Sequence, residues 1–199
     1  MSTTLPTNVM TLEAWARLPE DDPGELVDGR LVEEEMATII HDALVATLIM
    51  VLRAWLGAGR GLVGGSNAKF SVAKARGRKP DLYVYLPGSK LPSAHASVVD
   101  LPPDIMVEVV STARTDQRRD RIEKLAEYER FGVRYYWLVD PDLRSFEILE
   151  LGADGRYVHA VTVGDGRIDA VPGCDGLAID VDALWAEVER LSVQSGSPT

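Results

Sequence analysis

The chain is poor in cysteine and histidine, with one cysteine, Cys174, and three histidines among its 199 residues. A single cysteine excludes an internal disulfide and any multi-cysteine zinc site, and we expect a loop thiol there. Basic residues are also few, 21 against 31 acidic residues, which gives a formal net charge of -10. This balance argues against broad, nonspecific nucleic-acid binding, although it leaves room for a local basic cleft.

A long hydrophobic run and a nucleotide-binding loop are missing as well. The longest apolar run, residues 43–52, is too short to span a bilayer, and no signal-peptide pattern is visible. We therefore expect a cytoplasmic protein without a membrane partner. The glycine-rich stretch at 57–65 is not followed by Gly-Lys-Ser/Thr, which excludes a phosphate-binding loop of that type.

The apolar fraction of 46% and the charged fraction of 26% are those of an ordinary globular domain. We expect one domain over residues 11–191, with a disordered amino terminus at 1–10 and a flexible tail at 192–199. Strand and helix patterns alternate, and Asp28-Gly29 marks a hairpin turn. Helices are predicted at 11–18, 39–55, 115–131 and 181–191.

One predicted strand carries a charge in its middle. Period-2 alternation over residues 105–110 places Glu108 between Met106 and Val110 on one face of the strand. A carboxylate on a strand that is expected to be buried needs a partner or a function. Glu108 is therefore either ion-paired with the covering helix, or a metal ligand or general base.

The helix predicted at 115–131 carries a cation that Glu108 could use. At 100° per residue, Lys124 falls inside the apolar arc, whereas Asp120 and Glu127 fall on the charged face. A lysine in that arc either pairs with a carboxylate or serves chemistry. The first turns direct further polar side chains toward the sheet, and we expect them to contact nucleic acid: Gln117, Arg118 and Arg121.

A second cationic segment lies at 69–79 and contains no acid. It is either a solvated hairpin loop or a contact to a polyanion next to Asp81, at the start of the following strand. The DNA contacts expected from this segment are Lys74, Arg76, Arg78 and Lys79.

Two Pro-Asp steps precede Glu108, at Asp81 and Asp104. Along one strand Asp104 is roughly 13 Å from Glu108, too far for both to bind one Mg²⁺ at about 2.1 Å. Asp81 can come within range on an adjacent strand. Two carboxylates and a lysine are the parts that phosphodiester hydrolysis needs, because a divalent ion yields the nucleophile and the lysine orients water or stabilises phosphate charge.

These segments together resemble a known family, the bacterial putative restriction endonucleases of the PD-(D/E)XK nuclease superfamily. The matching segments are Pro80-Asp81 and residues 103–111, 120–128 and 132–141, and residues 25–29 with His41 match a weaker amino-terminal signature. The resemblance implies an α/β restriction-endonuclease-like core, with a mixed central sheet flanked by helices and with added β-hairpins.

The resemblance also implies roles for particular residues. It implies a DNA substrate and Mg²⁺, or Mn²⁺, held by Asp81 and Glu108. The superfamily usually places its catalytic lysine two residues after the acid, where this chain has Val110, so the resemblance suggests that Lys124 takes that role. Glu25 becomes a further acid of the site, and His41 an auxiliary residue.

Three functions remain open at this point. The first is a magnesium-dependent DNA endonuclease, expected as a symmetric homodimer because cutting both strands takes two sites. The second is a catalytically inactive nucleic-acid-binding or regulatory module of the same fold. The third is an interaction domain in which Glu108 forms a structural ion pair. For the first, we predict that Lys124→Ala abolishes cleavage while sparing the fold.

Overall fold

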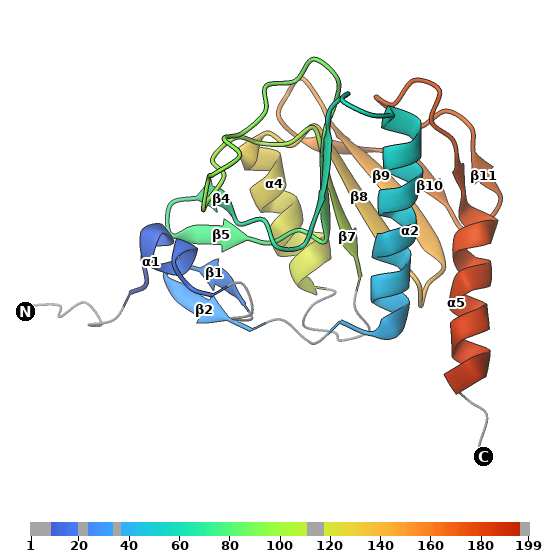
Figure 1. Cartoon of the computed structure of the whole chain (residues 1–199), viewed down its shortest axis with the longest axis horizontal. Coiled ribbons are helices and arrows are strands. Elements are labelled where there is room, and N and C mark those ends of the chain that lie inside the picture. Colours follow the sequence, from blue (N-terminus) through green and yellow to red (C-terminus); the bar gives the residue numbers. More distant parts are fainter. Residues whose placement is uncertain (1–8, 20–23, 34–36, 111–117, 196–199) are drawn as a thin grey trace, which may run out of the picture.

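The computed structural model describes residues 9–19, 24–33, 37–110 and 118–195. At its centre is a six-stranded mixed sheet (Figure 1). Within this sheet β7 and β8 are parallel, and the other neighbours pair antiparallel. In spatial order the strands are β10 (Tyr157–Val163), β9 (Ser145–Leu151), β8 (Tyr135–Asp140), β7 (Ile105–Val109), β6 (Leu82–Tyr85) and β3 (Leu62–Gly65).

A helical segment connects β7 to β8, as the parallel pairing of these strands requires. It contains a π-helical turn, η1 (Arg119–Lys124), which continues as α4 (Leu125–Phe131). The helix ends at Gly132, whose φ of 92° is the left-handed conformation that terminates helices. Residues 115–117, where the sequence predicts the start of this helix, lie outside the described residues, and so does the expected DNA contact Gln117.

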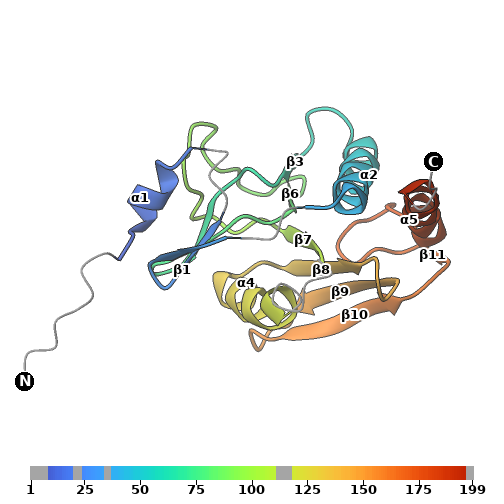
Figure 2. The same cartoon turned by 90° about the horizontal axis from the view of Figure 1, so that it is seen from below.

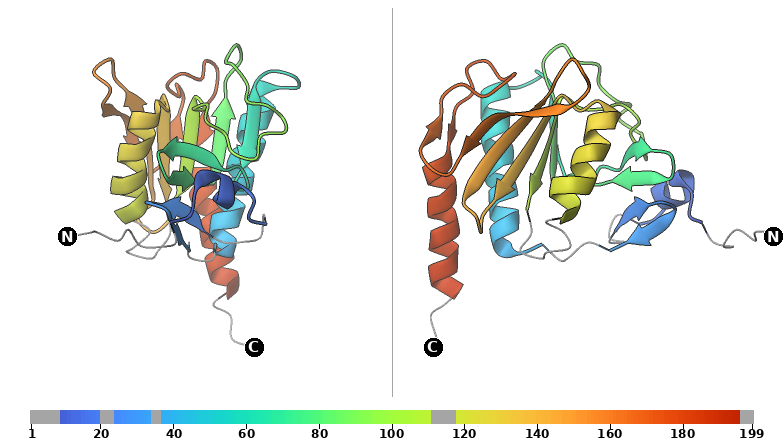
Figure 3. Two further views of the ribbon diagram at one scale, coloured as in Figure 1. Left: turned by 90° about the vertical axis from the view of Figure 1, so that its left-hand side faces the viewer. Right: turned by 180° about the vertical axis from the view of Figure 1, so that it is seen from behind.

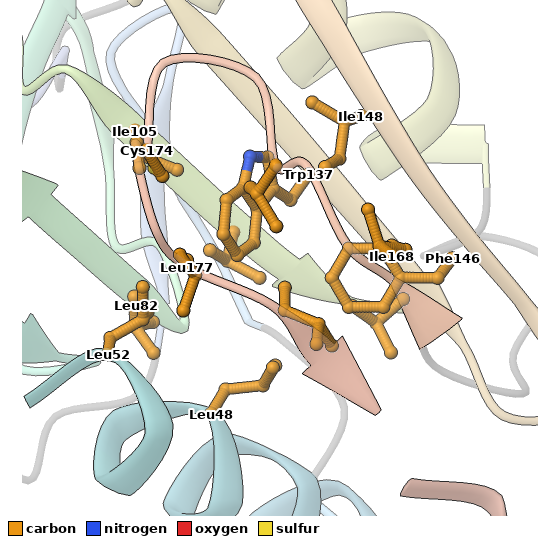
Figure 4. Close-up of a cluster of buried hydrophobic side chains, with 14 of the residues drawn as sticks. Leu48, Leu52, Leu82, Ile105, Trp137, Phe146, Ile148, Ile168, Cys174 and Leu177 are labelled. Carbon is orange, nitrogen blue, oxygen red and sulfur yellow. The ribbon is translucent and has the colours of Figure 1, made fainter. Parts of the chain in front are cut away.

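Helices cover both faces of the central sheet (Figures 2 and 3). On one face lie α2 (Ile39–Leu56) and α5 (Val181–Ser195), and on the other lies the η1–α4 segment. The buried leucines of α2 recur every four residues, Leu44, Leu48, Leu52 and Leu56. They pack on strand residues of the core, including Leu82, Ile105 and Trp137 (Figure 4).

The apolar helix α2 is longer than the apolar run at 43–52. Its 18 residues have a hydropathy of 1.8, so by length and composition alone it could cross a membrane. In the structure its four leucines are buried in the core, and partly buried side chains such as Val45 and Ile49 pack beside them. One stripe of this apolar helix thus lies on the sheet, whereas Ile39 and Met50 on its outer side stay exposed.

A second, antiparallel sheet lies beside the first. Its order is β2 (Arg30–Val32), β1 (Glu25–Val27), β5 (Arg76–Arg78) and β4 (Phe70–Ala73). The β1–β2 turn has positive φ at Asp28 and Gly29, as the Asp-Gly step predicts. Against this sheet α1 (Leu12–Ala16) packs Trp15 on Gly77, where any Cβ would come within 2.1 Å of the indole ring.

The chain ends differ in detail from the sequence prediction. A short hairpin of β11 (Arg167–Ile168) and β12 (Ile179–Asp180) precedes α5. Helix α5 continues past residue 191, where the tail was expected to begin, because no glycine or proline occurs before Gly196. At the other end, the amide of Met10 donates to the Gly29 carbonyl at 2.8 Å, so this residue is ordered against the hairpin.

Candidate active site

Strands β6 and β7 bring two of the expected acids together. Leu82 pairs with Val107 in antiparallel register, so Asp81, one residue earlier, comes opposite Glu108. Residues opposite each other in such a pair point to the same face, with Cβ atoms about 4.5–5.5 Å apart. Asp81 Oδ2 also accepts a hydrogen bond from the Val109 amide at 2.7 Å, which ties it to β7. The two carboxylates are therefore neighbours at the rim of the sheet.

Asp104 lies at the opposite end of β7. Its Oδ2 accepts a hydrogen bond from the Leu86 amide at 2.7 Å, so it anchors the far end of β6. The strand geometry thus separates Asp104 from Glu108, as the spacing along the chain predicts.

Glu108 lies on the sheet face that the alternation predicts and is only 2% exposed. Its Oε2 accepts from Lys124 Nζ at 2.9 Å, and its Oε1 accepts from the Tyr128 hydroxyl at 2.7 Å. Burial raises the pKa of Glu108 well above its ordinary value. Lys124 opposes this shift, but other carboxylates nearby add to it.

Lys124 points toward the sheet and is 3% exposed. Besides Glu108, its ammonium group contacts Asp120 Oδ1 at 3.2 Å and Glu25 Oε1 at 3.6 Å. Burial alone would lower the pKa of Lys124, but the three carboxylates outweigh it and raise the pKa well above its ordinary value. The lysine is therefore a buried cation surrounded by acids.

Two acids of this helix lie where the sequence did not predict them. Asp120 and Glu127 were expected on the charged face of the helix, outside its apolar arc, but they are 5% and 4% exposed. That prediction is wrong for two physical reasons. The π-helical turn changes the angle per residue from the 100° of an α-helix, and arginines of the β4–β5 hairpin bury Glu127. The four-residue spacing of Asp120, Lys124 and Tyr128 was the available signal.

Glu25, at the start of β1, also reaches this cluster and is fully buried. Its Oε2 accepts from Arg78 Nη1 at 2.5 Å, and its Oε1 accepts from the Lys79 amide at 2.9 Å. Burial would raise the pKa of Glu25, but Lys124 and Arg78 outweigh it and lower the pKa. Glu25 thus joins the small sheet to the charged cluster around Lys124.

The cationic segment at 69–79 is largely committed to internal contacts. Arg78 is completely buried, with Nε bonded to Glu127 Oε2 at 2.6 Å. Arg76 pairs with both Glu127 and Asp28. A buried guanidinium cannot reach a phosphate, so the expectation that Arg78 contacts DNA is corrected. Lys74 is exposed and Lys79 is half-buried, and both stay candidates.

Lys69, which belongs to the same segment, is 8% exposed. Its ammonium donates to the carbonyls of Trp15 and Leu18 at 2.9 and 3.0 Å, which fastens α1 to the small sheet. This lysine has a structural role.

The two arginines of the helix start differ from each other. Arg118 has a side chain that is 70% exposed, with Glu123 3.6 Å away. Arg121 reaches the sheet edge, where it pairs with Asp140 at 2.9 Å and Glu147 at 2.6 Å. Arg118 is therefore the more accessible of the two expected DNA contacts.

His41 stands in the first turn of α2, and its Nε2 lies 3.1 Å from Asp81 Oδ1. Burial would lower the pKa of His41, but its interactions with Asp81 and Asp42 together outweigh this effect and raise the pKa. Asp81 is thus held between the histidine and the backbone of β7.

The donor set at this rim suits a hard divalent ion. Within the described ranges no three His, Cys, Asp or Glu side chains form a ready-made cage, but Mg²⁺ commonly takes one or two carboxylates and keeps its waters. Acids outnumber cations here, and each carboxylate oxygen has two lone pairs. The acids are Glu25, Asp81, Glu108 and Asp120, and the cations are Lys124 and Arg78. The residues present therefore fit a metal held by Asp81 and Glu108.

A mixed sheet with helices on both faces defines the class of the fold, and comparison with known proteins agrees. The crystal structure of a putative nuclease of DUF820 from Anabaena variabilis has a similar fold, with a TM-score of 0.71 at 18% sequence identity. The match covers 90% of this chain and 99% of that one. The predicted α/β architecture is thereby confirmed.

The family follows from the sequence itself. The model of the Uma2 family, described as putative restriction endonuclease, matches residues 10–182. The chain therefore belongs to this family, as the resemblance indicated. No curated protein matches the chain.

Proposed function

We propose that the protein is a divalent-metal-dependent endonuclease that hydrolyses phosphodiester bonds in DNA. The observation that supports this most directly is the register of β6 and β7, which sets Asp81 opposite Glu108. The ammonium of Lys124 lies 2.9 Å from the same glutamate. A carboxylate pair next to a buried lysine is the equipment of metal-assisted phosphodiester hydrolysis.

Each residue has a distinct part in this proposal. Asp81 and Glu108 would hold Mg²⁺ or Mn²⁺, which would supply Lewis-acid stabilisation of the phosphate and lower the pKa of the attacking water. Lys124 donates a hydrogen bond to the attacking water or to a phosphate oxygen. Its ammonium must exchange one acceptor to do so, and the 3.6 Å contact to Glu25 is the longest of the three. His41 holds Asp81 from the helix side.

The DNA is expected along the accessible cations of the segment at 69–79 and of the start of the η1–α4 segment. The exposed or half-buried candidates are Lys74, Lys79 and Arg118. Cleavage of both strands takes two such sites, so we propose a symmetric homodimer. Sedimentation equilibrium would then give twice the mass of the chain.

The test is cleavage of plasmid and single-stranded DNA with Mg²⁺ or Mn²⁺ present. We expect wild-type protein to nick DNA, and Asp81→Asn and Glu108→Gln to be inactive because each replaces an anionic ligand by an amide. Nicking that persists in both variants would trace the activity to a contaminant or to another site and would refute the proposal.

The buried ion pair supports a second candidate, a nucleic-acid-binding module without cleavage. Both oxygens of Glu108 already accept a hydrogen bond, and Lys124 already contacts three carboxylates. Such saturation is also what a structural ion pair would show. Salt-sensitive DNA binding without nicking under any metal would favour this candidate over the first.

A further inference from the structure

Three buried side chains follow each other at four-residue spacing along the η1–α4 segment. Asp120, Lys124 and Tyr128 are 5%, 3% and 0% exposed. Residues four apart on a helix lie on the same face, and here that face is turned to the sheet. The middle residue is the proposed catalytic lysine, so the two outer residues bracket it along the helix.

Tyr128 contacts Glu108, the acid of the Glu108–Lys124 ion pair. Its hydroxyl donates to Glu108 Oε1 at 2.7 Å, whereas Lys124 donates to the other carboxylate oxygen, Oε2. Its ring is fixed edge-on against Tyr136, with centroids 5.1 Å apart and an interplanar angle of 83°. A rigid donor on one oxygen and an ammonium on the other leave the Glu108 carboxylate a single orientation.

Asp120 acts on the lysine. Its Oδ1 lies 3.2 Å from Lys124 Nζ, and its own backbone carbonyl accepts the Tyr136 hydroxyl at 2.9 Å. The aspartate therefore sits in a turn that the sheet holds in place. A buried carboxylate beside a single lysine is a poor source of stability, because desolvation offsets the Coulombic gain. A positioning role accounts for its location.

We propose that Tyr128 and Asp120 are positioning residues, Tyr128 for the Glu108 carboxylate and Asp120 for the Lys124 ammonium. This inference rests on the function proposed above. The two roles are separable. Tyr128 touches a metal ligand and leaves Lys124 its acceptors, whereas Asp120 touches the lysine and neither Asp81 nor Glu108 through any described contact. Removing the tyrosine hydroxyl therefore weakens metal binding, and neutralising the aspartate slows the chemical step.

The Tyr128 role is tested by Mn²⁺ binding to the protein without DNA, followed by the electron paramagnetic resonance signal of free Mn²⁺. We expect Tyr128→Phe to weaken Mn²⁺ binding by about 10–100-fold, as loss of a hydrogen bond to a metal ligand does. The matched control is Tyr157→Phe, which removes a tyrosine hydroxyl that donates to the Val133 carbonyl at 2.7 Å. It should bind Mn²⁺ as wild type does. Equal binding by Tyr128→Phe and wild type would overturn this role.

The Asp120 role is tested by steady-state cleavage. We expect Asp120→Asn to lower kcat by about 10–100-fold, because a small misplacement of a reacting group has effects of this size. KM should stay unchanged, and Asp120→Glu should restore part of kcat. Glu129→Gln is the control, since it removes one charge from the same helix, and the Glu129 carboxylate accepts from the Tyr157 amide. A kcat for Asp120→Asn equal to that of the control would overturn the role.

Failure of this inference can be told apart from failure of the proposed function. Wild-type protein that binds no Mn²⁺, or Glu108→Gln that binds it as tightly as wild type, would end both. Wild-type binding that Glu108→Gln abolishes and Tyr128→Phe leaves intact would end the Tyr128 role alone. A Tyr128→Phe chain without the wild-type circular dichroism spectrum would assign the hydroxyl to stability and also count against it, while the Asp120 measurement stands independently.

Discussion

Lys124, which we propose to be catalytic, is also a candidate for a role in stability. The prediction that Lys124→Ala spares the fold assumed that a lysine placed for chemistry holds little of the structure together. The structure buries this lysine among three carboxylates. Its removal would leave those acids in a low-dielectric site without their cation, which destabilises a fold strongly. The expectation is therefore revised for stability and kept for cleavage.

We now expect Lys124→Ala to abolish cleavage and to lower the free energy of unfolding by about 3–5 kcal/mol. Urea unfolding followed by circular dichroism measures the second effect. Lys90→Ala is the control, because Lys90 is exposed in the loop after β6 and such surface changes stay within about 0.5 kcal/mol. If both variants unfold at the wild-type midpoint, the buried ion pairs contribute nothing to stability.

The accessible cations are expected to contribute to DNA binding, which substitution can test. Replacing Lys74, Lys79 and Arg118 by glutamine should weaken duplex binding and reduce the slope of log K against log salt by up to about 0.9 for each lost phosphate contact. Arg78 is left out because it is buried. Fluorescence anisotropy at several salt concentrations gives the slopes, with Lys90→Gln as the control. An unchanged slope would remove these side chains from the DNA surface.

The sequence predicts the position of Glu108 but not the burial of Asp120, because the two residues lie on elements of different regularity. Alternation along β7 was enough to place Glu108 on the face with the helix, because a strand has one regular period. The burial of Asp120 was missed, since a π-helical turn departs from the 100° rule on which the helical wheel depends, and its four-residue spacing from Lys124 was the one signal for it. Local pattern predicts a face only while the element stays regular.

Among the elements, the β4–β5 hairpin matters most for the site. Arg78, on β5, bonds Glu127 through Nε at 2.6 Å and through Nη2 at 2.9 Å, and its Nη1 reaches Glu25. This one guanidinium joins β1, β5 and α4. The small sheet is thereby fastened to the helix that carries Lys124.

We expect Arg78→Ala to lower the free energy of unfolding by about 3–5 kcal/mol, because it removes the buried guanidinium that the carboxylates of Glu25 and Glu127 share. Arg78→Lys should also be destabilising, since an ammonium cannot reproduce the two-point contact with Glu127. Arg76→Ala serves as the matched control on the same strand, where the side chain is 28% exposed. Urea midpoints in the order wild type, Arg76→Ala, Arg78→Ala support the argument, and equal midpoints for the two alanine variants contradict it.

This hairpin also marks the limit of prediction at the element scale. The Asp28-Gly29 turn was predictable because its signal is local. The segment at 69–79 has an equally clear local signal, a run of cations, but its partners Glu25 and Glu127 lie about fifty residues away on either side. Composition suggested a solvated hairpin loop or a contact to a polyanion, whereas long-range ion pairs bury Arg78 of this segment inside the protein.

For the whole molecule, the two faces of the central sheet have different tasks. One face carries the larger apolar cluster, formed with the leucines of α2 and the loop that holds Cys174 (Figure 4). The other face combines a smaller apolar cluster with the buried charges around Glu108. The fold tolerates the excess of acids over cations at the site, because the opposite face of the sheet supplies most of the hydrophobic burial.

Cys174 belongs to the larger apolar cluster, so the pKa of its thiol indicates how well that cluster excludes solvent. It lies in a loop, as the sequence predicts, but it is only 1% exposed. Burial raises the pKa of its thiol from 9.0 to about 12, with smaller contributions from Asp104 and Asp175. The unfolded chain releases this proton near pH 9, whereas the folded chain keeps it. Between these values the folded state binds more protons, so the free energy of unfolding falls as the pH rises, and this contribution is fully present only below pH 9.

We therefore expect the Cys174 thiol to make the free energy of unfolding fall at high pH. Cys174→Ala should remove this contribution. From pH 8 to pH 10 the wild type should lose about 1.4 kcal/mol more unfolding free energy than the variant, since one pKa unit corresponds to about 1.4 kcal/mol. Buried tyrosines such as Tyr157, whose pKa is also raised by burial, affect both chains equally and cancel in this difference. Urea titrations at the two pH values, with a reducing agent present, measure it. Parallel losses in wild type and variant would mean that the thiol is already accessible to solvent in the folded state, and that the apolar face of the sheet is less tightly closed around this loop than the structure shows.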